Sequence, residues 1–124
     1  MSKPKIAIIE DDFAILQMYK AKFDASGYEV QTAQDGQSGL QLIESFKPNL
    51  ILLDLMMPTM SGLEVLERIK KKVGRDYKVI ALTNMADRDT QTKLQEYGVN
   101  DYIVKAEFTP SQVEDRVRKV LGVA

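Results

Sequence analysis

Two apolar segments of this chain run directly into carboxylates. Residues 6–9 precede Glu10 and Asp11. Residues 50–53 likewise precede Asp54. Consecutive aliphatic residues without alternation are typical of a strand that is covered on both faces, as in a parallel sheet. Open α/β sheets bind ligands beyond the carboxyl ends of such strands, so each carboxylate either caps the following loop or belongs to a reactive site.

Two later apolar runs end on polar residues of a different kind. Residues 79–82 precede Thr83, and residues 102–104 precede Lys105. In a parallel sheet all these carboxyl ends open on one edge, so a hydroxyl and an ammonium group are expected beside the carboxylates. Each residue alone could serve its own loop or form an ion pair, but their shared location favours a common site.

The chemistry of such a site follows from its charges. Two carboxylates about 4 Å apart repel by about 1 kcal/mol in water and by about 4 kcal/mol at an effective dielectric near 20. A divalent cation removes this repulsion, and a set of oxygen ligands without histidine or cysteine favours Mg²⁺, with Mn²⁺ as the alternative. Thr83 and Lys105 offer donors to an additional anion. The set predicts phosphoryl transfer to Asp54 itself, which gives an acyl phosphate.

The composition excludes several other kinds of site. The 124 residues include no histidine and no cysteine, which removes disulfides, thiol ligands and the usual triads and zinc sites. The 17 basic and 18 acidic residues give a net charge of −1, so the overall balance indicates neither a nucleic-acid nor a membrane partner. Residues 1–5 begin no apolar signal segment and no stretch could span a membrane, so we expect a cytoplasmic protein.

Five strand and helix alternations are expected to position these residues, within a single domain spanning residues 1–124. The expected strands are 6–9, 28–32, 50–53, 79–82 and 102–104. Helices are expected over 13–25 and 87–97, after the caps at 35–36 and 61–64, and from Pro110 onward. Such alternation is typical of an α/β doubly wound fold, a parallel sheet with helices on both faces.

The apolar spacing also predicts which side chains of the helices face the core. In segment 13–25 the apolar residues at helical spacing are Ile15, Met18, Tyr19 and Phe23. Segment 87–97 is the least apolar, so we expect it to be the most mobile helix. Its main inward positions are expected at Ala86, Thr90 and Leu94.

Four ordered motifs resemble those of a known family. They are residues 8–12 (IIEDD), 52–58 (LLDLMMP) followed by Ser61 and Gly62, 81–83 (ALT) and 101–105 (DYIVK). They are similar to the motifs of the receiver domain of two-component response regulators, the CheY-like family, and they cover essentially the whole chain. The resemblance implies a five-stranded, flavodoxin-like (βα)5 fold with strand order 2-1-3-4-5.

The same resemblance implies a role for each acidic residue. Asp54 would be the phosphoacceptor and would also contact the metal. Asp11 would be a direct Mg²⁺ ligand, and Glu10 would hold a metal-bound water. The backbone carbonyl of Met56 would supply a further ligand.

The resemblance also implies roles for residues that sense and retain the phosphoryl group. Thr83 and Lys105 would bind its oxygens. Tyr102 matches the family's switch aromatic, whose rotamer follows the threonine, although an ordinary half-buried tyrosine of the sheet is the alternative.

The resemblance also places Met56 and Met85 where they would flank the path of the hydrolytic water. Thioethers are weak acceptors and their bulk excludes water, so we expect slow loss of phosphate, unless both side chains face away from the site.

Two positions depart from the family pattern. Ala106 follows the lysine where the family usually has a proline in a cis peptide, and the segment 106–108 is about one residue longer. A cis bond to alanine costs about 2.5–4 kcal/mol, so we expect a trans bond and a changed loop. Asn84 replaces the small residue that usually follows the threonine, which narrows the approach to Asp54.

The implied partners are a sensor histidine kinase or phosphotransfer protein and a downstream protein target that binds the last two helices and the fifth strand. The chain ends soon after its last expected helix, so we expect a stand-alone domain without a DNA-binding or enzymatic output domain. It would not be an enzyme, apart from its own phosphotransfer and slow autodephosphorylation.

Four other functions compete with this one. A haloacid-dehalogenase phosphohydrolase needs a second aspartate where this chain has Met56, and a P-loop NTPase needs a G-x-x-x-x-G-K-[ST] motif that the sequence lacks. In a flavin carrier the acids after the first strand would repel the phosphate. The remaining rival is a pseudo-receiver, a binding module that is never phosphorylated.

Overall fold

The structure, a computed structural model, describes residues 3–73 and 76–123. Residues 1, 2 and 124, at the ends of the predicted 1–124 domain, lie outside this part of the chain. The limits of that domain therefore stay a prediction.

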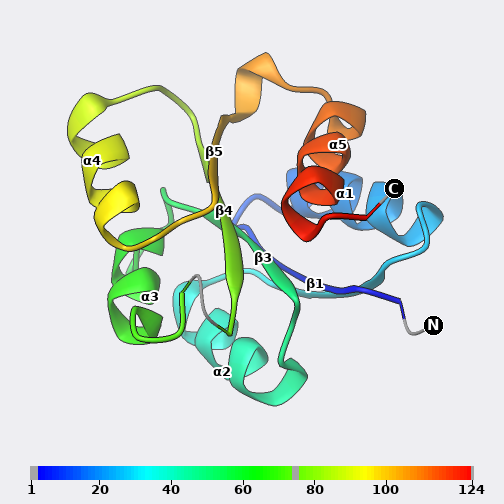
Figure 1. The fold of residues 1–124 in the computed structure, drawn as a ribbon, viewed down its shortest axis with the longest axis horizontal. Helices are drawn as coiled ribbons and strands as arrows, with labels where there is room; N and C mark the ends of the chain where they lie inside the picture. The colour runs from blue at the N-terminus through cyan, green and yellow to red at the C-terminus, as the bar shows by residue number, and fades with distance from the viewer. Residues whose placement is uncertain (1–2, 74–75, 124) are drawn as a thin grey trace.

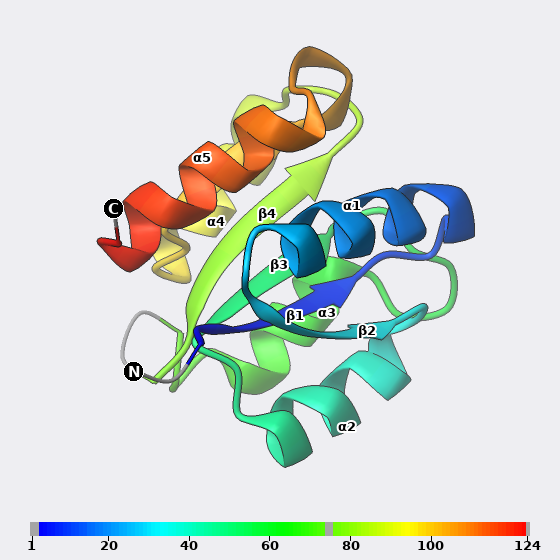
Figure 2. The ribbon, with the colours of Figure 1, turned by 90° about the vertical axis from the view of Figure 1, so that its right-hand side faces the viewer.

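Parallel strands form a five-stranded sheet in the order β2-β1-β3-β4-β5, with helices on both faces. The strands are β1 (Lys5–Ile9), β2 (Glu29–Ala33), β3 (Leu50–Asp54), β4 (Lys78–Thr83) and β5 (Asp101–Val104). The helices are α1 (Phe13–Ala25), α2 (Gly36–Phe46), α3 (Gly62–Ile69), α4 (Arg88–Glu96), the short 3-10 helix η1 (Lys105–Glu107) and α5 (Pro110–Leu121). Helices α1 and α5 cover one face, and α2, α3 and α4 cover the other (Figures 1 and 2). The predicted fold class and strand order are confirmed.

The apolar runs are continuous because both faces of the sheet are covered. In β1, Ile6 and Ile8 belong to the hydrophobic cluster beneath α1 and α5. Ala7 and Ile9 point the opposite way, into the cluster beneath α2, α3 and α4. All four side chains are fully buried, as the strand period of two requires for a central strand.

The helices start at polar caps. Thr109 and Gln112 form a complete capping box at the start of α5, with Pro110 in the first turn. Ser61 accepts a hydrogen bond from the Glu64 backbone N–H at 3.2 Å, which satisfies one donor at the start of α3. No described helix is both long enough and apolar enough to cross a membrane.

Two expectations about the inward helix faces are wrong. In α1, Tyr19 and Phe23 are buried as expected, but Met18 is 44% exposed. Leu16, which was not among the expected positions, is 2% exposed, because the buried face runs through Leu16, Tyr19 and Phe23. Ala86 lies before α4 and is exposed, because the helix begins only after the cap at residue 87. Leu94 is buried as expected, and Thr90 is half-buried. The high mobility of α4 stays a prediction.

Candidate functional site

Three carboxylates converge at the carboxyl ends of β1 and β3, which are neighbours in the sheet. Side-chain oxygens of Glu10, Asp11 and Asp54 all lie within 4.8 Å of one another. Glu10 and Asp54 are fully buried, and Asp11 is the most exposed of the three. The structure therefore brings together the three acids that the strand pattern placed at one edge.

Lys105 reaches the same edge from the far end of the chain. Its Nζ donates a hydrogen bond to Glu10 Oε1 at 2.7 Å and lies 3.3 Å from Asp54 Oδ1. The Lys105 side chain is only 11% exposed, so its charge is balanced by these carboxylates more than by water. Lys105 therefore forms the ion pair with an acid that the sequence offered as the alternative to phosphate binding.

The loop after β3 holds the Asp54 carboxylate and packs closely behind it. Asp54 Oδ1 accepts a hydrogen bond from the Met56 backbone N–H at 3.1 Å. Gly62, at the start of α3, donates its backbone N–H to the Leu55 carbonyl at 3.1 Å. A Cβ atom on Gly62 would lie 2.4 Å from the backbone oxygen of Asp54, so only glycine fits there. The sequence reasoning used Gly62 only as part of a motif and missed this packing role.

The electrostatics of the site favour a cation. Burial, together with the neighbouring Glu10 carboxyl, raises the pKa of Asp54 from 3.8 to about 6. The pKa of Asp11 is also raised, chiefly by the neighbouring Asp54 carboxyl and then by burial. Burial lowers the pKa of Lys105, but its contacts with Glu10 and Asp54 outweigh this effect and raise it overall. Negative charge thus remains in excess at this edge.

Two buried carboxylate oxygens at this edge lack a hydrogen-bond partner among the described residues, Glu10 Oε2 and Asp54 Oδ2. Leaving a buried acceptor unpaired costs about 1–3 kcal/mol, and more when it is charged. Hard divalent cations prefer such oxygen ligands, so the donor set present fits Mg²⁺. The Met56 carbonyl as a further ligand stays a prediction.

Thr83 and Tyr102 both bind the loop that follows β4. The Thr83 hydroxyl donates to the Met85 carbonyl at 3.3 Å, so it serves its own loop and has no described hydrogen bond to Asp54. The Tyr102 hydroxyl donates to the same carbonyl at 3.1 Å and accepts from the Asp87 backbone N–H at 3.3 Å. The two residues predicted to form a switch are therefore linked through one backbone carbonyl.

The two methionines predicted to control hydrolysis are among the most exposed apolar side chains that the structure describes. Met56 is 63% exposed and Met85 is 71% exposed. They follow Asp54 and Thr83 on two loops at the site edge, and their effect on the phosphate lifetime stays a prediction. Asn84 is also exposed.

The segment after Lys105 has the trans peptide bond that was expected before Ala106, since the described residues include no cis peptide. The segment forms η1 (Lys105–Glu107), and the backbone N–H of Phe108, which follows it, donates to the Lys105 carbonyl at 3.3 Å. The longer loop relative to the family stays a prediction. The Phe108 ring lies 4.9 Å from the Arg116 guanidinium, so the loop is anchored on α5.

Comparison with known proteins identifies relatives of this chain. Residues 6–118 match the response regulator receiver domain family. The chain is 37% identical over 121 residues to a Porphyridium aerugineum protein named probable transcriptional regulator ycf27, covering 98% of this chain and 49% of that protein. It is 32% identical over 117 residues to the alkaline phosphatase synthesis transcriptional regulatory protein PhoP of Bacillus subtilis, covering 94% of this chain and 48% of that protein. The chain thus spans about half the length of these relatives, and the stand-alone organisation stays a prediction.

Solved structures show the same fold. A CheY-like response regulator receiver domain protein from Methanospirillum hungatei JF-1 has a TM-score of 0.89 at 33% identity, with 98% of this chain and 95% of that chain covered. The BeF3 activated DrrB receiver domain has a TM-score of 0.83 at 30% identity, with 98% and 99% covered. With the family match and the fold in agreement, the chain belongs to the response regulator receiver domains of two-component systems, the CheY-like family.

Proposed function

We propose that this chain is the phosphoacceptor domain of a two-component phosphorelay and that Asp54 takes the phosphoryl group. One observation carries the proposal. The buried Asp54 carboxylate lies 3.3 Å from the Lys105 ammonium and within 4.8 Å of the Glu10 and Asp11 carboxylates. A nucleophile, an anion-binding cation and a metal-binding acid set therefore share one sheet edge.

The proposed step is an in-line transfer. An Asp54 carboxylate oxygen attacks phosphorus and forms an O–P bond, while the N–P bond of a phosphohistidine donor breaks and the imidazole leaves. A small acyl phosphate or phosphoramidate serves as a donor in the same way. Lys105 and Thr83 then bind phosphoryl oxygens, for which Lys105 gives up part of its contact with Glu10.

Glu10, Asp11, Asp54 and the Met56 carbonyl are the groups that would hold Mg²⁺, or Mn²⁺ in its place. When bound, the metal neutralises charge on the carboxylates and on the transferred phosphoryl group. The protein's own contribution is position, because Asp54 is held by the Met56 backbone N–H and backed by Gly62. These residues keep the nucleophile oriented.

Signalling is proposed to run through the loop after β4. The Thr83 hydroxyl leaves the Met85 carbonyl for the phosphoryl group, which removes one of the two hydrogen bonds at that carbonyl. Tyr102 then turns inward, and the surface of α4, β5 and α5 changes for partner binding, as a shift between two populations. The chain acts in the cytoplasm, and its partners are a sensor histidine kinase or phosphotransfer protein and a downstream protein target. Because relatives are named transcriptional regulators, transcription control is the output that we propose for a longer protein of this kind.

Incubation with phosphoramidate and Mg²⁺, followed by intact-protein and peptide mass spectrometry, tests the proposal. The wild type should gain one phosphoryl group on the peptide that carries Asp54, and Asp54→Asn should gain none. Asp115→Asn, an exposed acid on α5, is the matched control and should react like the wild type. Equal phosphorylation of Asp54→Asn would overturn the assignment, and an unreactive wild type would favour the pseudo-receiver.

A further inference from the structure

A groove lies between α2 and α3 at the edge of the sheet opposite Asp54. Its volume is about 1050 Å³, and its lining includes Pro48 and Asn49 before β3 and Tyr77 before β4. These residues precede the strands whose carboxyl ends carry Asp54 and Thr83. The groove is therefore separate from the carboxylate site and plays no part in the proposed phosphorylation.

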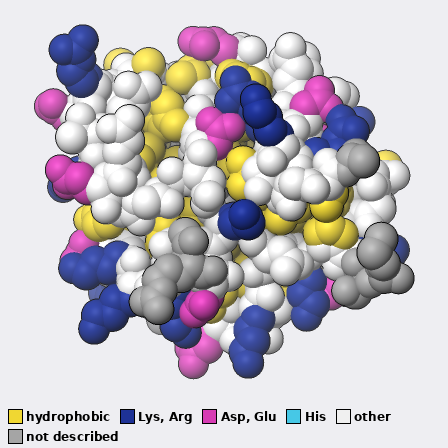
Figure 3. All heavy atoms as spheres, viewed as in Figure 1, with side chains coloured by type: hydrophobic (Ala, Val, Ile, Leu, Met, Phe, Trp, Pro, Cys, Tyr) yellow, Lys and Arg dark blue, Asp and Glu magenta, His cyan; other side chains and the backbone are white. Residues whose placement is uncertain are grey.

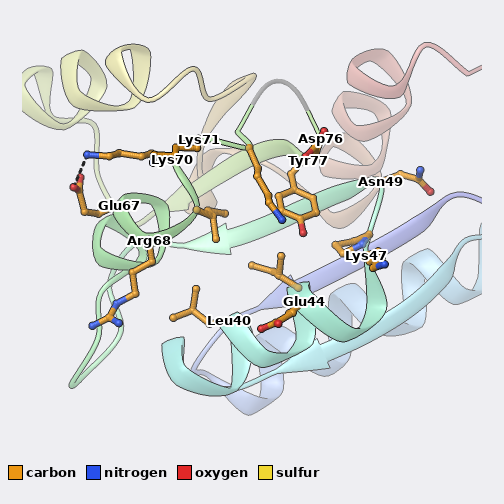
Figure 4. A pocket seen from close by; sticks show the side chains of 14 residues that line it. Leu40, Glu44, Lys47, Asn49, Glu67, Arg68, Lys70, Lys71, Asp76 and Tyr77 are labelled. Atoms are coloured by element: carbon orange, nitrogen blue, oxygen red, sulfur yellow. Dashed lines mark hydrogen bonds and ion pairs between the residues drawn. The ribbon is translucent and has the colours of Figure 1, made fainter.

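The floor of this α2–α3 groove is apolar. Leu40 and Ile43 of α2 line it from one side, and Ile69 of α3 and Tyr77 line it from the other. Leu40 and Tyr77 face the space between the two helices from opposite sides (Figure 4). Leu40 and Ile69 are only half-buried, so they still offer apolar area to a ligand.

The rim of the groove is rich in cations. Lys47, Arg68, Lys71 and Lys72 line it, and none of them has a carboxylate partner within ion-pair distance in the part of the chain that the structure describes. Lys70 differs from them, because it pairs with Glu67 at 2.9 Å. In the space-filling view, basic side chains gather along the lower edge of the molecule, over α2 and α3 (Figure 3).

Favourable interaction with the carboxyl ends of the helices explains some of the cations on the rim, but it does not explain why they surround an apolar floor. Lys47 and Lys70 cap α2 and α3, where cations stabilise the exposed carbonyl groups. This effect does not require an apolar floor between the helices. Lys47 also adopts a φ of 51°, a left-handed conformation that favours glycine, so the chain keeps a cation at a strained position.

We propose that the α2–α3 groove binds an acidic peptide segment that carries apolar side chains. The cationic rim matches its carboxylates, and Leu40 and Ile69 receive its apolar side chains, as in other grooves between helices. A phosphate backbone fits less well, because Glu44, Glu67 and Asp76 also line the groove and would repel one charge per nucleotide more than a few carboxylates separated by apolar side chains.

Fluorescence anisotropy on the full chain tests this proposal. The probe is a short fluorescein-labelled peptide of glutamate, leucine and phenylalanine. Two control peptides replace either its glutamates by lysine or its apolar residues by serine, and a labelled single-stranded oligonucleotide serves as a polyanion. Only the acidic apolar peptide should bind saturably, and amide chemical shifts should change around Leu40, Ile69 and Tyr77.

Variants locate the binding and separate it from phosphorylation. The double variant Lys47→Gln with Lys72→Glu should bind at least tenfold more weakly, whereas Lys119→Glu on α5 makes a charge change away from the groove and should bind like the wild type. Asp54→Asn should also bind like the wild type, so a failure of the phosphorylation proposal leaves this one intact. No saturable binding, equal binding by the double variant, or stronger binding of the oligonucleotide at the groove would overturn the proposal.

Discussion

The Lys105 ammonium lies 2.7 Å from Glu10 Oε1, although 95 positions separate the two residues in the chain. This contact places the cation that follows the last strand against an acid that follows the first strand. Glu10 nevertheless retains a second buried oxygen without a partner among the described residues. The lysine therefore neutralises the edge only in part, and the predictions below follow from the charge that remains.

Added Mg²⁺ should stabilise the protein. At a hundredfold excess over its dissociation constant, a ligand of the folded state adds about 2.7 kcal/mol to the free energy of unfolding. Thermal melts with and without Mg²⁺ measure the gain as a higher midpoint. Asp11→Ala should lose most of the shift, and Glu29→Gln, an exposed acid on β2, should keep it. An equal shift in Asp11→Ala would place the bound metal elsewhere.

The metal-free protein should lose stability as pH rises across the titration of Asp54. Its folded-state pKa of about 6 lies above the ordinary 3.8, so the folded state binds the proton more tightly than the unfolded state. The resulting stability is fully present below pH 3.8 and is lost by about pH 6. Asp54→Asn should remove this loss, so near neutral pH its free energy of unfolding should exceed that of the wild type by about 3 kcal/mol.

Urea unfolding at several pH values, in the presence of a chelator, measures this effect. Glu29→Gln again provides the control, because its carboxylate is exposed. A wild type whose stability is the same on both sides of this range would show that Lys105 already compensates the Asp54 charge in full.

Thr83→Ala should uncouple phosphorylation from the surface of α4, β5 and α5. The Thr83 hydroxyl and the Tyr102 hydroxyl both donate to the Met85 carbonyl, so movement of one alters the bonding of the other. Chemical-shift changes on phosphorylation should be large in the wild type and small in Thr83→Ala. Thr92→Ala, on the exposed side of α4, controls for the loss of a hydroxyl. Undiminished changes in Thr83→Ala would show that the coupling takes another route.

Polar substitutions at the two exposed methionines should shorten the phosphate lifetime. A polar side chain can orient the attacking water by a hydrogen bond, which a thioether cannot do. Lowering the activation free energy of hydrolysis by 1.4 kcal/mol raises the rate about tenfold. Phosphate loss from purified phosphoprotein should therefore be faster in Met56→Asn, in Met85→Glu and in the double variant. Met18→Gln, an exposed methionine of α1, should decay like the wild type. Unchanged decay in all three variants, with normal folding, would exclude control by these positions.

Tyr28→Phe should destabilise the fold by about 1–2 kcal/mol. The Tyr28 hydroxyl donates to the buried Glu114 carboxylate at 2.9 Å, and burial, followed by this contact, raises the pKa of Tyr28. Removing it leaves Glu114 with Arg118 as its remaining partner. Urea unfolding should show the loss, while Tyr77→Phe, whose hydroxyl makes no hydrogen bond among the described residues, should stay within about 0.5 kcal/mol of the wild type.

Local patterns were sufficient for the elements and for the edge on which the site lies. A run such as residues 50–53 predicts a buried strand because strand burial has a period of two and both faces are covered. Thr109 and Pro110 predict the start of α5 because caps are satisfied by neighbours in sequence. Parallel strands then bring Asp54 and Lys105 to one edge whatever their separation along the chain.

Contacts between distant elements were decided only by the tertiary structure. The sequence offers both Glu10 and Asp54 to Lys105, and packing places the ammonium nearer to Glu10. Gly62 is required only because α3 approaches the Asp54 backbone, which no local pattern reports. The inward face of α1 includes Leu16 beside the expected Tyr19 and Phe23 and leaves Met18 exposed, which likewise depends on how the helix lies on the sheet. The same physical reason covers all three, since side-chain contacts depend on the relative placement of whole elements, and sequence spacing describes each element alone.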